Sequence, residues 1–397
     1  MNEVRALVRA FDAAVAAGER CALATIVSVE GSSYRRPGAR LLVRESGETS
    51  GSISAGCLEG DVIERAKRVI REGRAELAVY SNASTSDEMA WGLGLGCNGT
   101  VSVLIEPLSE DYRYIDALRS SLDLPADAGP ITAATVYECT GPAIEGFEPV
   151  GRLIIDEVGE TRIDRLDESW ARVLAAKIGS GLVSGPVSCD LGDAAATVFV
   201  EYLVPPTPVV VFGAGPDAVP IVELAQGLGW SVEVVDPQCR PVSRERFSIA
   251  DKVTLARPED VAGSVKITPR TLAIVMSHDY VNDRQLLQFL LASPARYIGV
   301  MGPRKRTERM LEEIGSAEPE LIPERSDMEC VYTPIGLDIA ANSPAEVALS
   351  IVAEMRAVLN GRSGGMLRDR RGSIHGSPQD AKPEKFSTVE AGDGAIG

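Results

Sequence analysis

The sequence predicts an α/β protein in two parts: an N-terminal α/β domain and a C-terminal Rossmann-like domain with a doubly wound parallel sheet. The chain has 397 residues, which is enough for two or three domains. A stiff segment, Val204-Pro205-Pro206-Thr207-Pro208, is the best boundary between them. After this segment short apolar strands alternate with helical patterns, which is typical of a parallel sheet covered on both faces.

The first domain, residues 1–106, begins with a predicted helix on which Val4, Leu7, Val8, Phe11 and Val15 share one face. Strands are expected at 21–29, 40–43, 76–80 and 101–106, with a second helix after residue 57. Glycine-rich loops lie at 30–40, 50–57 and 91–99.

Residues 107–204 are less informative, and we interpret them as a β-rich extension of the first domain. Strands are expected at 131–137, 151–155 and 196–203, with one helix at 168–178. No internal repeat is evident.

The Rossmann-like domain is expected over residues 205–365. Its predicted strands lie at 209–212, 231–235, 252–255, 272–276 and 296–300, and a long final helix carries one apolar stripe from Val347 to Leu359. Residues 366–397 are rich in glycine, serine, proline and charge, so we expect a disordered tail.

Composition excludes several classes of function. A net charge of −17 argues against nucleic-acid binding and against docking on an anionic membrane. No apolar run approaches the length of about 18 residues that a membrane span needs, and the N-terminus lacks the apolar core of a signal peptide. The seven cysteines include no CxxC pair, so we expect reduced thiols in a cytoplasmic protein. With only His278 and His375 as histidines, no metal site is predicted.

The strongest single motif is a dinucleotide-binding fingerprint. The segment from Gly213 to Ala218 follows a predicted buried strand and opens a helix, and Asp236 ends the next strand. Gly213 and Gly215 would let the backbone approach a phosphate at the helix N-terminus. Asp236 would accept a hydrogen bond from a ribose hydroxyl. The fingerprint predicts the fold, whereas the ligand is a separate question.

Two further loops should face the same crevice, because ligands bind at the carboxyl ends of parallel strands. One contains His278 and Asp279, and the other contains Gly302, Arg304 and Arg306. Basic residues at a helix start interact unfavourably with the helix dipole. Their presence there therefore favours a phosphate-binding role over a merely solvated turn. His278 is either a hydrogen-bond donor or general base for a ligand, or a structural residue.

Two cysteines are candidates for chemistry. Cys57 follows Gly56 at a loop-to-helix junction, where the helix N-terminus and nearby Arg35 or Arg36 would favour a reactive thiolate. Such a thiolate suits sulfur transfer or contact with a soft metal, and the alternative is a small buried residue. Cys97 lies in the densest glycine loop, which either wraps a planar ligand or forms a tight turn.

Four segments, taken together, resemble one family: residues 31–40, residues 51–59, the Gly213 fingerprint, and Pro334 to Ile339. They are similar to the xanthine dehydrogenase accessory (XdhC/CoxI) family, over residues 1–106 and 205–360. The resemblance implies an accessory factor rather than a turnover enzyme. Such a factor binds the molybdenum cofactor, as molybdopterin or its dinucleotide form. It supports sulfuration with a cysteine desulfurase as sulfur source, and it delivers the cofactor to a molybdenum hydroxylase client of the xanthine dehydrogenase or CO dehydrogenase type.

Under this resemblance, Cys57 would be the reactive residue and would face the metal end of the cofactor across the domain interface, with Arg35 beside it. The fingerprint glycines, Asp236, Arg304 and Arg306 would hold the phosphate end. Two alternatives stay open: an NAD(P)-dependent oxidoreductase and a non-catalytic dinucleotide-binding protein. A homodimer through the final helix is also expected.

Overall fold

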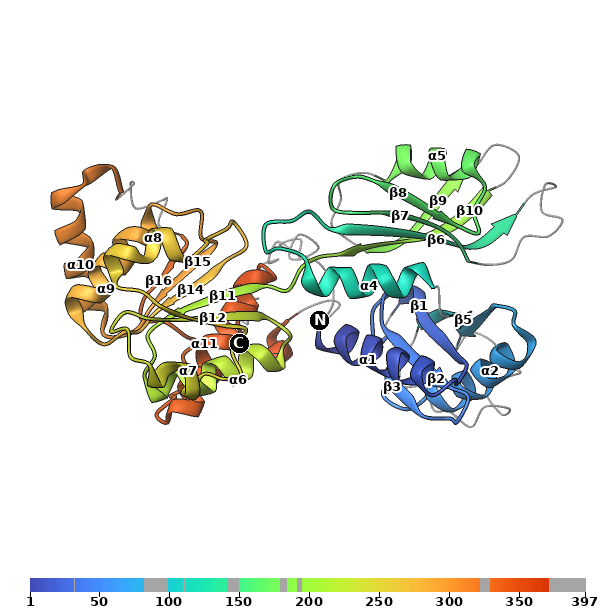
Figure 1. The fold of residues 1–397 in the computed structure, drawn as a ribbon, viewed down its shortest axis with the longest axis horizontal. Helices are drawn as coiled ribbons and strands as arrows, with labels where there is room; N and C mark the ends of the chain where they lie inside the picture. Colours follow the sequence, from blue (N-terminus) through green and yellow to red (C-terminus); the bar gives the residue numbers. More distant parts are fainter. Residues whose placement is uncertain are drawn as a thin grey trace, which may run out of the picture.

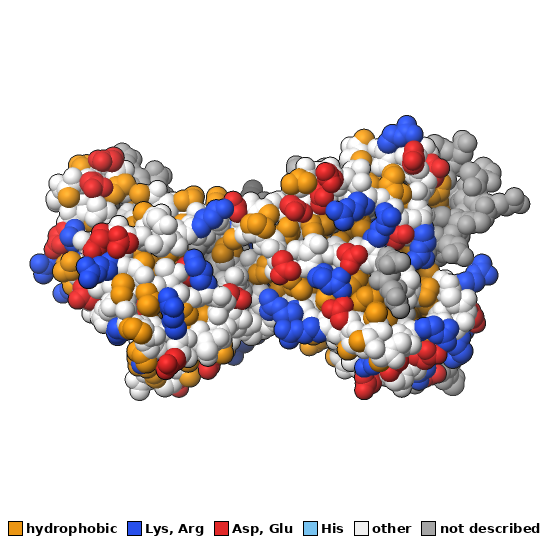
Figure 2. Space-filling view, viewed as in Figure 1, with side chains coloured by type: hydrophobic (Ala, Val, Ile, Leu, Met, Phe, Trp, Pro, Cys, Tyr) orange, Lys and Arg blue, Asp and Glu red, His pale blue; other side chains and the backbone are white. Residues whose placement is uncertain are grey.

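The structure is a computed structural model that describes residues 1–31, 33–81, 99–109, 112–140, 150–178, 184–190, 195–321 and 329–370. The predictions for Cys97 and for most of the expected disordered tail lie outside these residues. The chain forms two lobes (Figure 1), and the space-filling view narrows between them (Figure 2). On the face shown in Figure 2, acidic and basic side chains are interspersed. No helix in the described part of the chain is long and apolar enough to cross a membrane.

The first part of the right-hand lobe is an antiparallel sheet in the order β3-β2-β1-β5-β4. Its strands are β1 (Cys21–Gly31), β2 (Arg40–Arg44), β3 (Thr49–Gly51), β4 (Glu76–Ser81) and β5 (Gly99–Leu108). Helix α1 (Asn2–Ala16) precedes the sheet in the chain, and α2 (Glu59–Glu72), which follows β3 and precedes β4 in the chain, packs on it. Apolar residues on one face of α2, including Val62, Ala66 and Val69, are buried against β1, β2 and β5.

Residues 107–204 do not add strands to this sheet, apart from the end of β5. They build a second five-stranded sheet in the order β8-β7-β6-β10-β9. Its strands are β6 (Ile131–Thr140), β7 (Gly151–Ile155), β8 (Thr161–Asp164), β9 (Gly185–Asp190) and β10 (Ala195–Leu203). Helix α4 (Arg113–Asp123), which the sequence analysis missed, precedes it, and α5 (Glu168–Lys177) lies between β8 and β9.

The two sheets are therefore copies of one topology, and the prediction that the chain has no internal repeat is wrong. Each copy runs helix, three strands, helix, two strands, and the strand orders match one for one. The register matches as well: Thr25 of β1 lies opposite Arg40 of β2, and Thr135 of β6 lies opposite Arg152 of β7.

The copies are joined by a shared core and by two reciprocal buried ion pairs. Helices α1 and α4 contribute Leu7, Phe11 and Leu118 to one cluster that also includes residues of both sheets. Arg40 of the first copy pairs with Glu201 on β10, and Arg152 of the second copy pairs with Glu106 on β5. Because β2 corresponds to β7 and β5 to β10, each copy gives the other the same pair, as in an isologous dimer interface.

The left-hand lobe contains a six-stranded sheet in the order β13-β12-β11-β14-β15-β16, and every strand pair in it is parallel. The strands are β11 (Pro208–Phe212), β12 (Ser231–Asp236), β13 (Lys252–Leu255), β14 (Leu272–Val275), β15 (Tyr297–Val300) and β16 (Val331–Tyr332). This is the Rossmann order, and the direction of winding reverses between β11 and β14. The predicted doubly wound sheet is confirmed.

Helices cover both faces of this sheet. They are α6 (Val219–Gly227), α7 (Val242–Arg246), α8 (Val261–Ser264), α9 (Tyr280–Leu291), α10 (Arg304–Ala317) and α11 (Pro344–Leu359). Short 3₁₀ turns lie at η1 (Pro216–Ala218), η2 (Pro258–Asp260), η3 (Pro319–Leu321) and η5 (Leu367–Asp369). Helices α6 and α11 share one apolar cluster with the sheet, and α9 and α10 share the other.

Several described contacts join the two lobes where the strands of the parallel sheet begin. The Asn2 amide donates to the carbonyl oxygens of Gln226 at 2.7 Å and Gly227 at 2.9 Å, at the C-terminal end of α6. Arg270, just before β14, donates to the Ala126 carbonyl of the first lobe at 3.4 Å. These contacts therefore lie at the edge opposite the carboxyl edge, where Rossmann sheets bind their ligands.

Candidate functional site

The loop that carries Cys57 is organised by one carboxylate, Glu59. Its oxygens accept hydrogen bonds from the backbone N–H groups of Ser54 at 2.8 Å and Gly56 at 3.1 Å. The Ser54 hydroxyl donates to Glu59 and accepts from the Leu58 N–H at 3.1 Å. Glu59 is the first residue of α2, so this network folds residues 52–58 onto the helix N-terminus and leaves Cys57 half-buried beside it.

The same network determines the ionisation of Glu59. Burial alone would raise its pKa, but the hydrogen bonds from the Ser54 side chain and backbone, from its own backbone N–H and from Ser52 outweigh burial, and the pKa is lowered. Gly56 has φ +106, and a Cβ there would meet nothing within 4 Å, so the loop needs glycine for its backbone conformation and not for space.

Arg35 is held by α1 and not by the thiol loop. Its guanidinium forms two hydrogen bonds with the Glu3 carboxylate, at 3.0 and 2.5 Å. The side-chain hydrogen bond to Glu3 raises the pKa of Arg35 most, and the charge of Glu59 contributes less. Arg35 is thus electrostatically linked to the Cys57 loop through Glu59, whereas Arg36 lies exposed on the same turn.

At the carboxyl edge of the parallel sheet, the loops after β11 and β14 meet at the point where the winding reverses. Gly213 has φ +144, and a Cβ there would lie 2.4 Å from the Met276 carbonyl oxygen at the end of β14. The first fingerprint glycine is therefore required by the close approach of two backbones.

The second fingerprint glycine is covered by a side chain. A Cβ on Gly215 would lie 2.3 Å from Oδ1 of Asp217, the second residue of η1. The other oxygen of Asp217 lies 2.7 Å from Nε2 of His278, whose backbone is left-handed with φ +62. His278 therefore joins the loop after β14 to the fingerprint loop across the crevice.

Asp236 does not have the geometry expected of a ribose acceptor. It is fully buried, and its two oxygens accept from the backbone of Gln238 and Arg240 at 3.0 Å each, from the Arg240 guanidinium, and from the Ser243 hydroxyl at 2.6 Å. Burial would raise its pKa, but these hydrogen bonds lower it. Asp236 instead closes its own loop and fixes Arg240, whose side chain is 39% exposed.

The loop after β15 is tied to the loop after β14 through Asp283 of α9. This buried carboxylate accepts hydrogen bonds from the Ser277 N–H at 3.0 Å and from Arg306 at 2.8 Å. Asp279 caps α9 by accepting from the Asn282 N–H at 2.9 Å, which is a structural role. Arg304 is the exposed first residue of α10, as the sequence predicted, and Gly302 precedes it with φ +115.

The structure thus gathers the loops of Gly213, His278 and Arg306 at one edge, and no contact among the described residues joins Cys57 to them. The lobes meet through Asn2 and Arg270 where the strands begin, and a Rossmann ligand site lies where they end. The expectation that Cys57 faces the crevice across the domain interface finds no support among the described contacts. Sequence spacing could not reveal this, because it does not say which edge of the sheet receives the first lobe.

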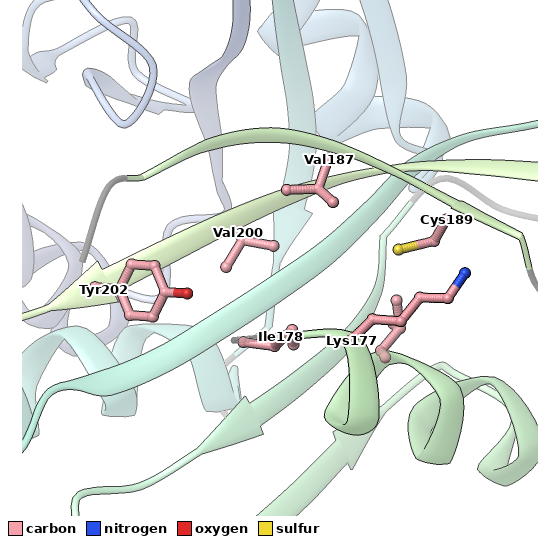
Figure 3. A pocket seen from close by; sticks show the side chains of 7 residues that line it. Lys177, Ile178, Val187, Cys189, Val200 and Tyr202 are labelled. Carbon is pink, nitrogen blue, oxygen red and sulfur yellow. The ribbon is translucent and has the colours of Figure 1, made fainter. Parts of the chain in front are cut away.

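A cavity in the second copy lies elsewhere. It has a volume of about 70 Å³ and lies between α5, β9 and β10, with Lys177 and Cys189 at one end and Tyr202 at the other (Figure 3). Pockets for cofactor-sized ligands measure about 300–1,000 Å³, so this cavity is too small for a pterin. Among the described residues, no group of three or more His, Cys, Asp and Glu could hold a metal ion.

Four residues of these sites were missed from the sequence: Glu59, Asp217, Arg240 and Asp283. Each lies within six residues of a predicted site residue, and each is a charged group that partners a loop. For Glu59 and Asp217 the available signal was an acidic residue next to a glycine loop, since a loop with several inward N–H groups needs an acceptor.

Fold and site together define a class of protein. A Rossmann domain, in which the Asp217 side chain covers the second fingerprint glycine, is joined to a lobe of two α/β copies that carries the Cys57 loop. Residues 209–355 match the XdhC Rossmann domain, and residues 14–81 match the XdhC and CoxI family. The chain is also 30% identical over 346 residues to a probable xanthine dehydrogenase subunit of Bacillus subtilis, covering 87% of this chain and 95% of that protein. The chain belongs to the XdhC and CoxI family.

Two other comparisons extend over almost the whole chain. The molybdenum cofactor insertion chaperone PaoD of Escherichia coli is 23% identical over 360 residues, covering 90% of this chain and 89% of that protein. A crystal structure described as a xanthine dehydrogenase from Bacillus halodurans superposes with a TM-score of 0.70 at 28% identity, covering 90% of this chain and 96% of that one.

Proposed function

We propose that this chain is an accessory factor that binds the molybdenum cofactor, supports its sulfuration and delivers it to a molybdenum hydroxylase client. The observation that carries the proposal is its similarity, over about nine-tenths of both chains, to a protein named as a molybdenum cofactor insertion chaperone. Membership of the XdhC and CoxI family supports the same role. The cofactor is cargo here, as molybdopterin or its dinucleotide form, and a cysteine desulfurase is the proposed sulfur source.

In this proposal the two sites contact different parts of the cargo. Cys57, half-buried at a helix start, is the soft ligand that suits the molybdenum or its sulfur. The crevice loops with Gly213, Gly302 and Arg304 suit the phosphate end, with Arg306 oriented by Asp283. No contact among the described residues joins the Cys57 loop to the crevice loops. We therefore propose two separate binding sites for the cofactor on one chain and not one closed pocket.

The alternative of an NAD(P)-dependent oxidoreductase has weaker support. Its expected ribose acceptor, Asp236, is fully buried and already accepts hydrogen bonds at both oxygens.

The role of Cys57 is tested by client activation. We expect Cys57→Ala to leave the fold and the molybdenum content of the client unchanged, while client activity and its cyanide-labile sulfur fall close to background. Cys139→Ala is the matched control, because Cys139 is also half-buried and lies in the second copy. Normal client sulfuration in cells that contain only the Cys57→Ala chain would overturn the assignment.

A further inference from the structure

The fingerprint of the Rossmann domain has a feature that a dinucleotide site does not need: a carboxylate lies over its second glycine. In that motif the second glycine lacks a side chain so that a pyrophosphate can approach the backbone. Here the Asp217 oxygen Oδ1 lies 2.3 Å from where a Gly215 Cβ would stand. The open face of Gly215 is therefore occupied by an anion that belongs to the chain.

The carboxylate is held in that position from across the crevice. Oδ2 of Asp217 lies 2.7 Å from Nε2 of His278, and the Asp217 side chain is 28% exposed. His278 reaches it from the loop after β14 with a left-handed backbone. The pair spans the place where the winding of the sheet reverses, which is where Rossmann domains bind their ligands.

A phosphate and this carboxylate compete for one place. Both are anions, so their like charges repel, and both are favoured by the positive end of α6. The side chain of Asp217 is flexible, so it can leave without moving the backbone.

We propose that Asp217 is a specificity gate of the Rossmann crevice. Its carboxylate excludes phosphate groups, including those of nicotinamide and adenine dinucleotides, from Gly215 unless the ligand has other contacts strong enough to displace it. The saturated Asp236 works in the same direction, because it removes the usual ribose contact. The inference concerns the crevice alone, so it can fail while the molybdenum-cofactor role holds, and the reverse.

Calorimetric titration of the full chain with ADP tests the gate. Asp217→Asn keeps the size of the side chain and its hydrogen-bonding capacity towards His278 but removes the charge, and Asp217→Ala empties the position. We expect both to bind ADP about tenfold more tightly than the unaltered chain or better, a difference of about 1.4 kcal/mol. Glu223→Gln is the matched control, because it removes one exposed charge from α6 away from Gly215, and it should leave the affinity unchanged.

A second substitution locates the binding. Gly215 has φ −71 and ψ 165, which alanine adopts without strain. In the Asp217→Ala background, Gly215→Ala returns a methyl group to the emptied position, so it should abolish the gain in ADP affinity. The proposal is overturned if both Asp217 variants bind ADP no better than the unaltered chain while melting at its temperature. It is equally overturned if the gain survives Gly215→Ala.

Discussion

Glu59 is a single carboxylate that determines the shape of a loop. It accepts from two backbone N–H groups and two serine hydroxyls, and its charge lies at the N-terminal end of α2, where the helix dipole favours an anion. Cys57 lies inside the turn that these bonds close. The loop therefore depends on Glu59 at least as much as on its glycines.

We expect Glu59→Gln to lower the free energy of unfolding by about 1 kcal/mol at pH 7, because the amide leaves part of this partly buried network without an acceptor. Since the folded pKa of Glu59 is lowered, its contribution is present above the ordinary glutamate pKa and is lost as the pH falls through the folded value. Urea unfolding of the unaltered and Glu59→Gln chains, in steps from pH 7 to below the ordinary glutamate pKa of about 4.3, should show their difference in stability shrinking in the most acidic steps.

Glu64→Gln serves as the control for this substitution. Glu64 lies on the same helix, its side chain is 72% exposed, and it pairs only with Lys67 among the ion pairs of the described residues. Its loss should cost less than about 0.5 kcal/mol at any pH. A Glu59→Gln chain as stable as the Glu64→Gln chain at pH 7 would contradict the organising role of Glu59.

Among the elements, the two copies in the first lobe hold each other together through equivalent residues. Thr25, Arg40 and Glu106 occupy the positions that Thr135, Arg152 and Glu201 occupy in the second copy, and the ion pairs cross between copies. The geometries are not identical. Nε of Arg152 donates to Thr135 at 2.8 Å, whereas Arg40 Nε and Thr25 Oγ1 are both buried without a partner.

We expect Arg152→Met to lower the free energy of unfolding by about 3–5 kcal/mol, because it leaves the Glu106 carboxylate buried without its cation. The double variant with Glu106→Leu should recover most of this loss. Arg119→Met, which removes an exposed ion pair between α4 and α1, should cost about 1 kcal/mol or less. Urea unfolding of the four chains is the measurement, and a single variant no less stable than Arg119→Met would show that the pair is not structural.

This duplication also marks the limit of sequence-based prediction. The strands and helices were predictable because each shows its own hydrophobic period. The repeat was not, because only a few residues, such as Thr25 and Thr135, coincide, and they are separated by loops of different length. A matching order of Thr, Arg and Glu, on the first, second and last strand of each copy, was the available signal.

At the scale of the whole molecule, the sequence predicted the Rossmann domain and the loops that meet at its crevice. It did not predict that Asp217 covers Gly215 or that Asp236 bonds to its own loop, because residue spacing does not determine the direction of a side chain. Nor did it predict which edge of the sheet faces the first lobe. That follows from the hydrogen bonds of Asn2 to the end of α6 and of Arg270 to Ala126.

The central claim is that this chain handles the molybdenum cofactor, and a cofactor inventory tests it most directly. The chain would be purified from cells with active molybdopterin synthesis, its released ligand oxidised to the fluorescent pterin, and molybdenum counted per protein chain. We expect pterin and molybdenum together in appreciable stoichiometry, reduced when Arg304→Ala removes the exposed cation at the crevice. Absence of both from cells that load other molybdoenzymes normally would contradict the claim.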